Sequence, residues 1–256
     1  MSRNPAKDFD EIAGDYAFFE QHATQAEQDA RAYQAHLASI KPADGTVDIL
    51  DFGCGTGTFT ARLLELTGWT PQRLRLTLVE TAESARRQAV ERLARFSTSP
   101  LMESAALPVP VERRFDVVLA NHVFYYVPDL QRTLGRLIAA LAPAGVFLTA
   151  VAARTNALCE LSVTGFRQLA REMPYQASED VELALRTLNA HYEKRHVPYK
   201  LSFPDSTENR TRILRFMLAD HLAQMPRRPL LEWFDQFSDA GRIDIETESD
   251  HYTVRP

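Results

Sequence analysis

The sequence predicts an α/β fold in which a mostly parallel β-sheet carries helices on both faces. The main observation is that short β-rich runs alternate with helical patterns through the first two-thirds of the 256 residues. A second observation is the run 115–121, which is almost wholly apolar, as expected of a strand that is buried on both faces. A third is the glycine-rich segment 53–57, which falls between a strand pattern and a helix pattern.

The strands and helices of this alternation follow one another closely. The strand patterns are short and rich in branched apolar residues, and they lie at 47–52, at 74–80, within 100–110, at 115–121 and at 146–152. The helix patterns repeat apolar residues near helical spacing, and they lie at 58–66, 82–96 and 130–141. Pro143 and Gly145 follow the last of these and are typical of the end of a helix.

The pattern changes after Arg154. Helical segments are expected at 156–172, 179–192 and 207–223, and strands at 197–203 and 251–255. The simplest architecture is a sheet of five parallel strands that a C-terminal pair extends to seven, with helical insertions over its carboxyl edge. We therefore expect three regions, which are a helical cap at 1–40, the core at 41–154, and helical insertions with the final strands at 155–256.

Composition and charge exclude several classes of protein. Hydrophobic residues make up 45% of the chain and charged residues 25%, which is ordinary globular composition. The formal net charge is −5 and no long basic run is present, so a nucleic-acid partner is not expected. The longest apolar stretch, 146–153, is far shorter than the ~18 residues of a spanning helix, so we expect a cytoplasmic protein without a membrane partner.

The cysteines and histidines do not predict a metal or disulfide site. Cys54 and Cys159 are far apart and form no CxxC or Cys/His motif. His191 and His196 are five residues apart, a spacing that does not place them on one helical face. No metal is therefore expected.

A glycine turn is the strongest motif of the chain. Residues 51–57 read Asp-Phe-Gly-Cys-Gly-Thr-Gly at the end of a strand, where glycines without a Cβ atom allow a ligand to approach the backbone. The spacing is GxGxG, whereas the dinucleotide fingerprint is GxGxxG. A nicotinamide-dependent reductase is therefore disfavoured.

Two acids follow at the same edge of the predicted sheet. Glu80 ends the next strand, in a position to accept hydrogen bonds from both hydroxyls of a ribose. Glu103 stands shortly before Leu107 and Pro108 in the loop after the third strand, where it is suited to the exocyclic amine of an adenine.

In this order the motifs resemble those of the class I S-adenosylmethionine-dependent methyltransferases, over residues 49–151. The resemblance implies a Rossmann-like fold, S-adenosylmethionine as the cofactor, and methyl transfer to a small-molecule acceptor. The cofactor-binding residues that it implies are Asp51, Gly53, Gly55, Gly57, Glu80, Glu103 and Asn121. A partner subunit that kept this fold without catalysis is the alternative from another class.

The end of the fourth strand is where the acceptor is expected. Residues 121–129 read Asn-His-Val-Phe-Tyr-Tyr-Val-Pro-Asp, without the two prolines that methyltransferases of DNA bases usually carry here. Aromatic rings attract a cationic sulfonium or ammonium, although packing under the next helix is the other reading of these rings. His122 can exchange a proton near neutral pH, and a structural histidine is the alternative. The expected catalytic residues are His122, Tyr16, Tyr125 and Tyr126.

Within this superfamily the chain is similar to the histamine N-methyltransferase group. The similarity lies in residues 16–24, 124–129, 157–161 and 205–218. It departs where that group binds its acceptor, because the acid of the N-terminal cap falls near Gln25 and the amide of the fourth strand falls at His122. The implied substrate-binding residues are Phe18, Phe19, His22 and Gln25.

These departures and the aromatic cap define the expected reaction. A histidine at 122 favours an acceptor that gives up a proton, such as an indole- or imidazole-like heterocycle methylated at nitrogen or at an activated carbon. An amine is also consistent with the resemblance, and a phenol methylated at oxygen is an alternative acceptor. The clustered rings of the 1–40 segment predict a lid that closes over cofactor and acceptor and excludes water.

Overall fold

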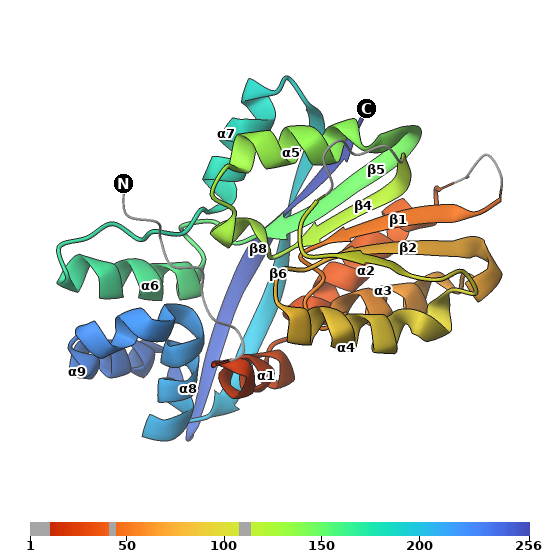
Figure 1. The fold of residues 1–256 in the computed structure, drawn as a ribbon. Helices are drawn as coiled ribbons and strands as arrows, with labels where there is room; N and C mark the ends of the chain where they lie inside the picture. The colour runs from red at the N-terminus through yellow and green to blue at the C-terminus, as the bar shows by residue number, and fades with distance from the viewer. Residues whose placement is uncertain (1–10, 41–44, 108–113) are drawn as a thin grey trace.

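The computed structural model describes residues 11–40, 45–107 and 114–256. The predicted lid at 1–40 therefore lies partly outside the described residues, as does Pro108 of the predicted adenine loop. Within the described residues, one eight-stranded sheet forms the centre of the molecule, with the strand order β3-β2-β1-β4-β5-β8-β6 and β7 paired to β8 (Figure 1). The strands are β1 (Val47–Phe52), β2 (Leu74–Val79), β3 (Met102–Ser104), β4 (Phe115–Asn121), β5 (Leu141–Val151), β6 (His191–Pro204), β7 (Ser238–Asp239) and β8 (Arg242–Arg255).

The pairing of these strands confirms the predicted architecture. β1 to β5 run parallel to one another, and β8 joins β5 in the antiparallel sense. β6 then pairs with β8 along its whole length, and the two-residue β7 adds to the same strand. Because β1 lies between β2 and β4, the turns that follow these strands meet at one edge of the sheet.

Helices cover both faces of the sheet, as predicted. They are α1 (Ala13–His22), α2 (Gln25–Leu37), α3 (Thr58–Thr67), α4 (Glu83–Leu93), α5 (Leu130–Ala139), α6 (Ala157–Gln168), α7 (Ser178–Thr187), α8 (Thr207–Leu218) and α9 (Arg227–Glu232). Short 3₁₀ helices lie at η1 (Pro71–Arg73), η2 (Ala94–Phe96), η3 (Phe124–Tyr126), η4 (Ala219–Gln224) and η5 (Trp233–Phe237). Several helices begin at a side chain that caps the first turn, as Asp129 and Asn156 do for α5 and α6.

The buried apolar side chains form three clusters. One lies between the sheet and α2, α3 and α4, and a second lies on the opposite face under α5 and α7. The third gathers α1, α6, α8 and α9 around the distal parts of β6 and β8, for example at Phe203 and Ile245. Figure 1 shows this third group beside the long β6 and β8 strands, away from β1 and β2. The N-terminal segment is therefore shared between clusters, since α1 packs with α8 and α2 packs with α3.

The C-terminal half differs from its sequence-based prediction in the extent of several elements. The helices expected at 156–172 and 207–223 end at Gln168 and Leu218. The helix expected at 179–192 ends at Thr187, because Asn189 adopts a left-handed φ of 50° and starts the turn into β6. The strands expected at 197–203 and 251–255 are far longer, at 14 residues each. The start of β6 has exposed charged side chains, and its pairing with β8 rather than an apolar pattern makes it a strand.

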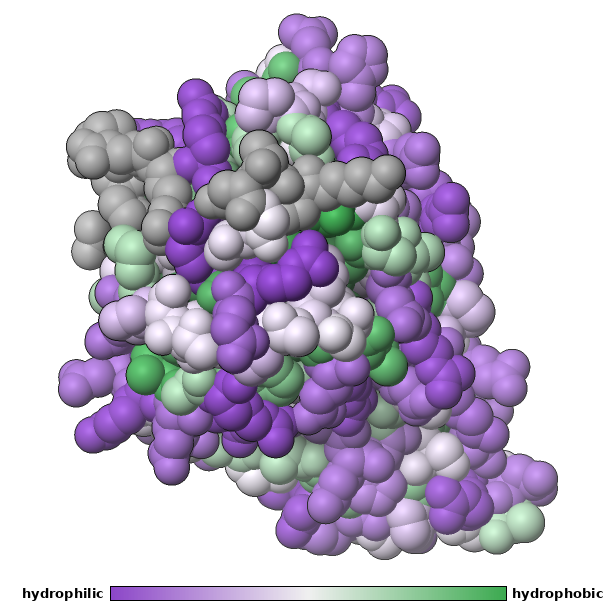
Figure 2. All heavy atoms as spheres, turned by 90° about the vertical axis from the view of Figure 1, so that its right-hand side faces the viewer, coloured by the Kyte–Doolittle hydropathy of each residue, from purple (hydrophilic) through white to green (hydrophobic). Residues whose placement is uncertain are grey.

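The described surface is largely polar. Figure 2 shows one face on which hydrophilic side chains dominate and hydrophobic ones are scattered. The large hydrophobic residues that are exposed in the described part of the chain are Leu66, Met102 and Leu183, which lie on separate elements. In the same part of the chain, each helix is too short or too polar to cross a membrane.

Candidate active site

The glycine turn connects β1 to α3. Gly53, Gly55 and Gly57 all have positive φ values, of 74°, 53° and 75°, which residues with a side chain rarely adopt. A Cβ atom on Gly53 would lie 2.3 Å from Val123 Cγ2, and one on Gly57 would lie 3.1 Å from Ala89 Cα. A Cβ atom on Gly55 would meet no described atom within 4 Å. Gly53 and Gly57 therefore allow tight packing, and Gly55 presents open backbone to a ligand.

Glu80 lies against this turn. One carboxylate oxygen accepts a hydrogen bond from the Gly55 backbone N–H at 3.0 Å, and the other accepts one from the Ala82 N–H at 2.9 Å. These bonds fix the carboxylate at the carboxyl end of β2, beside the open face of Gly55. The position fits the ribose-binding role predicted for Glu80.

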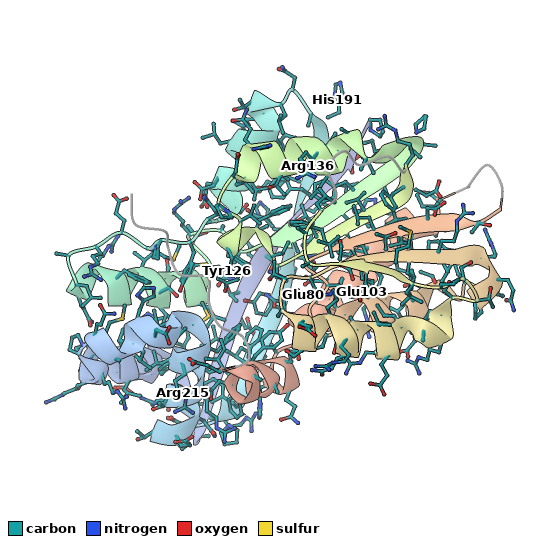
Figure 3. All side chains as sticks on the ribbon, viewed as in Figure 1. Glu80, Glu103, Tyr126, Arg136, His191 and Arg215 are labelled. Carbon is teal, nitrogen blue, oxygen red and sulfur yellow. The ribbon has the colours of Figure 1, made fainter. Side chains whose placement is uncertain are left out.

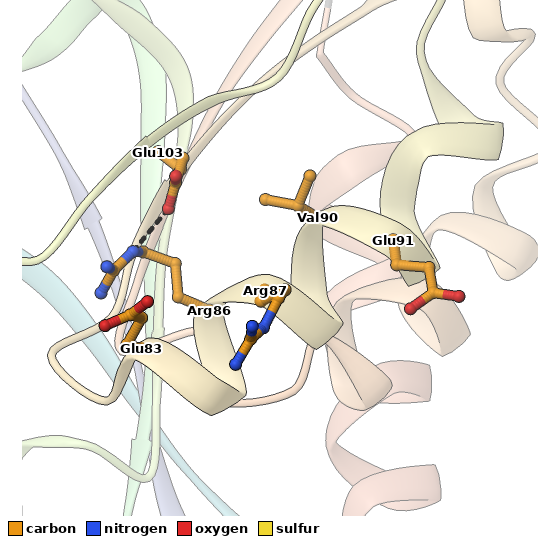
Figure 4. A pocket seen from close by; sticks show the side chains of 6 residues that line it. All are labelled: Glu83, Arg86, Arg87, Val90, Glu91 and Glu103. Atoms are coloured by element: carbon orange, nitrogen blue, oxygen red, sulfur yellow. Dashed lines mark hydrogen bonds and ion pairs between the residues drawn. The ribbon is translucent and has the colours of Figure 1, made fainter.

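Glu103 lies on β3, close to Glu80 (Figure 3). Its carboxylate accepts a hydrogen bond from Arg86 Nε at 2.5 Å, and Arg86 Nη1 donates to the Glu80 carbonyl oxygen at 2.7 Å. Figure 4 shows the Arg86–Glu103 ion pair at one end of a depression of about 360 Å³ along α4. Arg86 thus joins the Glu103 carboxylate to the backbone of Glu80, and no motif in the sequence would have identified it.

Asp51 is buried beneath the turn. Its carboxylate accepts a hydrogen bond from the Thr60 hydroxyl of α3. The pKa of Asp51 is raised to about 7, mainly by burial; the Thr60 hydrogen bond opposes this rise and the nearby Glu80 adds to it. Asp51 therefore ties β1 to α3 below the glycine turn.

These residues fit an adenosyl cofactor with an amino-acid tail. The open backbone at Gly55 and the two acids at the ends of β2 and β3 lie in one row along the edge of the sheet. The observation behind this fit is the open space at Gly55, which a Cβ atom would occupy and which the ligand can use to approach the backbone.

A second polar group lies at the end of β4. His122 has a left-handed φ of 53°, which is uncommon for a residue with a side chain. Its Nε2 atom lies 2.9 Å from Asp29 Oδ2, and its Nδ1 atom lies 2.9 Å from the Tyr125 hydroxyl. Both ring nitrogens of the predicted base are therefore hydrogen-bonded. The preceding Asn121 donates to the same Asp29 oxygen at 3.2 Å and accepts from Tyr33.

Aromatic rings lie next to this group. Tyr126 of η3 packs against Tyr175, with ring centroids 5.4 Å apart, and burial raises the pKa of its hydroxyl, with Tyr16 among its neighbours. Tyr16 of α1 lies 5.5 Å from Phe216 of α8 and hydrogen-bonds to Glu20. The structure thus brings two of the predicted catalytic tyrosines, Tyr16 and Tyr126, to one region.

The residues that the resemblance assigns to the acceptor lie mainly in packing positions. Phe18 and Phe19 are buried in the third cluster, against Phe203 and Phe216 respectively. His22 Nδ1 lies 2.8 Å from the Phe18 carbonyl oxygen, and Gln25 donates to the Ser249 hydroxyl at 3.3 Å. These contacts hold α1 and the start of α2 on the β6–β8 pair.

Several residues of this region were missed from the sequence. Asp29, one turn after Gln25 on α2, accepts hydrogen bonds from His122 and from His251 of β8. Glu20 on α1 lies near Arg62 and Arg92, and burial raises its pKa. Asp29 could have been found from the sequence, because it lies four residues after Gln25, the position at which the resemblance expects an acid. Nothing in the sequence connects His251 to this site.

His196 has two acidic neighbours that its sequence spacing did not reveal. Its Nδ1 atom lies 2.6 Å from Asp250 and 3.4 Å from Glu248, both on β8. Asp250 also accepts from Lys194 at 2.9 Å and from the Ser178 hydroxyl. His196, Glu248 and Asp250 are thus held together by ion pairs and hydrogen bonds.

The comparisons with known proteins agree with this arrangement. A family model described as a methyltransferase domain matches residues 50–147, which include the glycine turn, Glu80 and the end of β4. A trans-aconitate 2-methyltransferase of Rhodopseudomonas palustris (strain BisB18) is 34% identical over 208 residues, covering 76% of this chain and 75% of the relative. A second, from strain BisA53, is 36% identical over 140 residues, covering 54% of this chain and 50% of the relative.

Solved structures share the fold. A putative methyltransferase from Bacillus halodurans matches with a TM-score of 0.56 and 16% identity, covering 88% of this chain and 97% of its own. The YcgJ protein from Bacillus subtilis matches with a TM-score of 0.53 and 13% identity, covering 88% and 99%. With the curated relatives, the domain match and the glycine-turn geometry, these likenesses lead to one conclusion: the chain belongs to the class I S-adenosylmethionine-dependent methyltransferase superfamily.

Proposed function

We propose that this methyltransferase acts on a small nitrogen heterocycle, such as an indole- or imidazole-like ring, and that His122 and Tyr125 help to remove a proton from it. S-adenosylmethionine supplies a methyl group that is activated by a positively charged sulfur. The observation that carries the proposal is the hydrogen-bond chain Asp29–His122–Tyr125 at the carboxyl end of β4. A heterocycle N–H gains from a proton acceptor at this place, because its nitrogen becomes a better nucleophile as the proton leaves.

The region combines charges of both signs with aromatic rings. Asp29 and Glu20 contribute carboxylates, and Glu20 lies close to Arg62 and Arg92. Arg215 of α8 is paired with Asp15, at 2.7 Å and 2.9 Å (Figure 3 labels Arg215 beside α1). The rings of Tyr16 and Tyr126 provide aromatic surface for a planar heterocycle.

A second candidate function is methylation of a carboxylate, as the names of the curated relatives suggest for those proteins. The observation in its favour is the 34% identity over 208 residues with a trans-aconitate 2-methyltransferase. A carboxylate is already ionised at neutral pH and needs no base. The two candidates therefore differ in their need for His122.

Transfer of a labelled methyl group distinguishes these candidates. We expect kcat/KM for the best compound in a panel of indoles and imidazoles to exceed that for trans-aconitate by about 10- to 100-fold, since one missing charge-assisted hydrogen bond costs about 1.5–3 kcal/mol. His122→Ala should lower turnover by about 10²- to 10⁴-fold, the usual contribution of a general base. His196→Ala is the control, because His196 does not belong to the Asp29–His122–Tyr125 hydrogen-bond chain. This variant should keep full turnover.

Each remaining outcome has a definite meaning. Preferred methylation of trans-aconitate, with turnover that does not depend on His122, would establish the second candidate. Preferred methylation of phenols would show that the acceptor atom is oxygen and would overturn the proposed heterocycle. Equal turnover of His122→Ala and the wild type on a heterocycle would remove the proposed base.

A further inference from the structure

Asp29 is the centre of a buried hydrogen-bond network that joins three elements. Its side chain on α2 is 1% exposed. His122 Nε2, at the end of β4, lies 2.9 Å from Oδ2, and His251 Nε2, on β8, lies 2.7 Å from Oδ1. The Asn121 amide donates to Oδ2 at 3.2 Å. One carboxylate thus serves two histidines and an amide.

The charge state of Asp29 fixes the protons around it. Burial on its own would raise the pKa of Asp29, but His122 and His251 lower it by more, so the pKa lies well below its usual range. An ionised carboxylate can only accept hydrogen bonds. Each histidine must therefore carry a proton on Nε2. In the neutral form of the His122 ring, the Nδ1 atom is then unprotonated and can accept the proton of the Tyr125 hydroxyl.

The two histidines differ on their other nitrogen. His251 Nδ1 is buried and has no hydrogen-bond partner among the described residues, so a proton placed there would be an unpaired buried donor. His122 Nδ1 faces the Tyr125 oxygen, which also accepts from the Ala152 N–H at 2.7 Å. A hydroxyl oxygen has two lone pairs, so it can accept from both. Among the described residues, His122 Nδ1 therefore has a hydrogen-bond partner and His251 Nδ1 has none.

Tyr125 links this network to the reaction. Burial raises the pKa of Tyr125 well above its ordinary value, so the hydroxyl does not persist as a phenolate. It can take up a proton from a substrate only while it gives its own to His122. The left-handed backbone of His122, with φ 53°, is an unfavourable conformation that the surrounding contacts maintain.

We propose that Asp29 is a positioning residue that holds His122 in the Nε2–H tautomer, so that its Nδ1 atom can receive the Tyr125 proton during methyl transfer. The proposal rests on the function proposed above. The acceptor nitrogen forms a bond to the methyl carbon as the carbon–sulfur bond breaks and the sulfonium becomes a neutral thioether. The acceptor N–H proton passes to the Tyr125 oxygen, the Tyr125 proton passes to His122 Nδ1, and the imidazolium formed lies beside Asp29. Its extra proton returns to water before the next cycle.

The first test is ¹⁵N NMR of the histidine side chains in the unaltered protein. His122, assigned by its loss in His122→Ala, should show a protonated Nε2 and an unprotonated Nδ1. In Asp29→Asn an amide –NH₂ replaces one acceptor, so we expect the tautomer of His122 to change or to become mixed. An Nδ1–H tautomer in the unaltered protein would overturn the proposal, and this result needs no variant of Asp29 to fold.

The second test is a double-mutant cycle with labelled S-adenosylmethionine. Asp29→Asn should lower kcat by about 10²- to 10⁴-fold, close to the loss in His122→Ala, while KM for the acceptor and affinity for S-adenosylhomocysteine stay within about threefold. If Asp29 acts through His122, Asp29→Asn should cost nothing further in the His122→Ala background. Glu27→Gln, an exposed change on the same helix, is the control.

The outcomes of the two proposals are distinguishable. Independent, multiplying losses in the double variant, or full kcat in Asp29→Asn, would overturn the role of Asp29 even if a heterocycle is the acceptor. Methylation of trans-aconitate without dependence on His122 would overturn the proposed function, whereas the NMR measurement would still report whether Asp29 sets the tautomer.

Discussion

At the scale of single residues, Glu80 provides the sharpest test of the cofactor site. We expect Glu80→Gln to weaken binding of S-adenosylhomocysteine by about 10- to 100-fold, because hydrogen bonds to a charged group are worth about 1.5–3 kcal/mol and the amide keeps only one acceptor oxygen. Isothermal titration calorimetry measures this affinity. Glu83→Gln, at an exposed position on α4, is the matched control. Equal affinity in the two variants would contradict the role of Glu80.

At the scale of one element, two glycines of the turn between β1 and α3 should differ in their effects on stability and on ligand binding. Gly55→Ala should cost only about 1–2 kcal/mol of unfolding free energy, because the positive φ is strained but the space around the new Cβ is open. Gly57→Ala should cost more, since its Cβ would also meet the backbone of Ala89 at 3.1 Å. Urea unfolding measures both values.

The same pair should behave in the opposite order in ligand binding. Gly55→Ala should lose affinity for S-adenosylhomocysteine in calorimetry, because the methyl group fills the space that the ligand needs. A Gly55→Ala protein that binds as the wild type does would show that the ligand approaches elsewhere.

The helix α1 is the second element with a testable role. Removal of residues 1–22 should reduce turnover by at least about 100-fold, a loss typical of a misplaced substrate, because Tyr16 and Glu20 leave the site. The clusters on the two faces of the sheet contain no residue of α1, so a cooperative unfolding transition should remain. Removal of residues 1–10 alone, which keeps α1, should preserve activity. Full turnover without α1 would contradict the lid.

At the scale of the whole molecule, Asp51 couples stability to pH. Its pKa is raised from 3.8 to about 7, mainly by burial, so the folded protein binds a proton that the unfolded chain has released between these values. The unfolding free energy should therefore fall as pH rises from about 4 to about 7, by at most about 4 kcal/mol from this group. Urea unfolding between pH 4.5 and 8 measures the change.

Two variants isolate this contribution. Asp51→Asn cannot titrate, so the fall with pH should be smaller than in the wild type by the Asp51 share. Thr60→Val removes the hydrogen bond that lowers the Asp51 pKa, so its fall should extend to higher pH. Parallel pH curves for Asp51→Asn and the wild type would show that Asp51 is ionised throughout.

The sequence by itself determined the features that depend on neighbouring residues. The alternation of strands and helices, the glycine turn at 53–57 and the acids at the ends of two successive strands follow from local periodicity and turn chemistry. Parallel strands in succession bring their carboxyl ends to one edge, so Glu80 and Glu103 could be placed together without coordinates. The length of β6 could not be predicted, because its charged residues become a strand only through pairing with β8.

The tertiary structure alone decided which side chains are hydrogen-bonded to one another at the end of β4. His122 and Asp29 are 93 residues apart in sequence, and Asp29 and His251 are 222 residues apart. No periodicity connects such positions, and they meet only because α2 packs across the sheet where β4 ends and where His251 of β8 pairs with Ala150 near the carboxyl end of β5. For the same reason the sequence could not show that Phe18 and Phe19, expected at the acceptor, pack in the third cluster with residues of α6, α8 and α9. Local sequence sets which residues form each element, but long-range packing sets which side chains share a hydrogen bond.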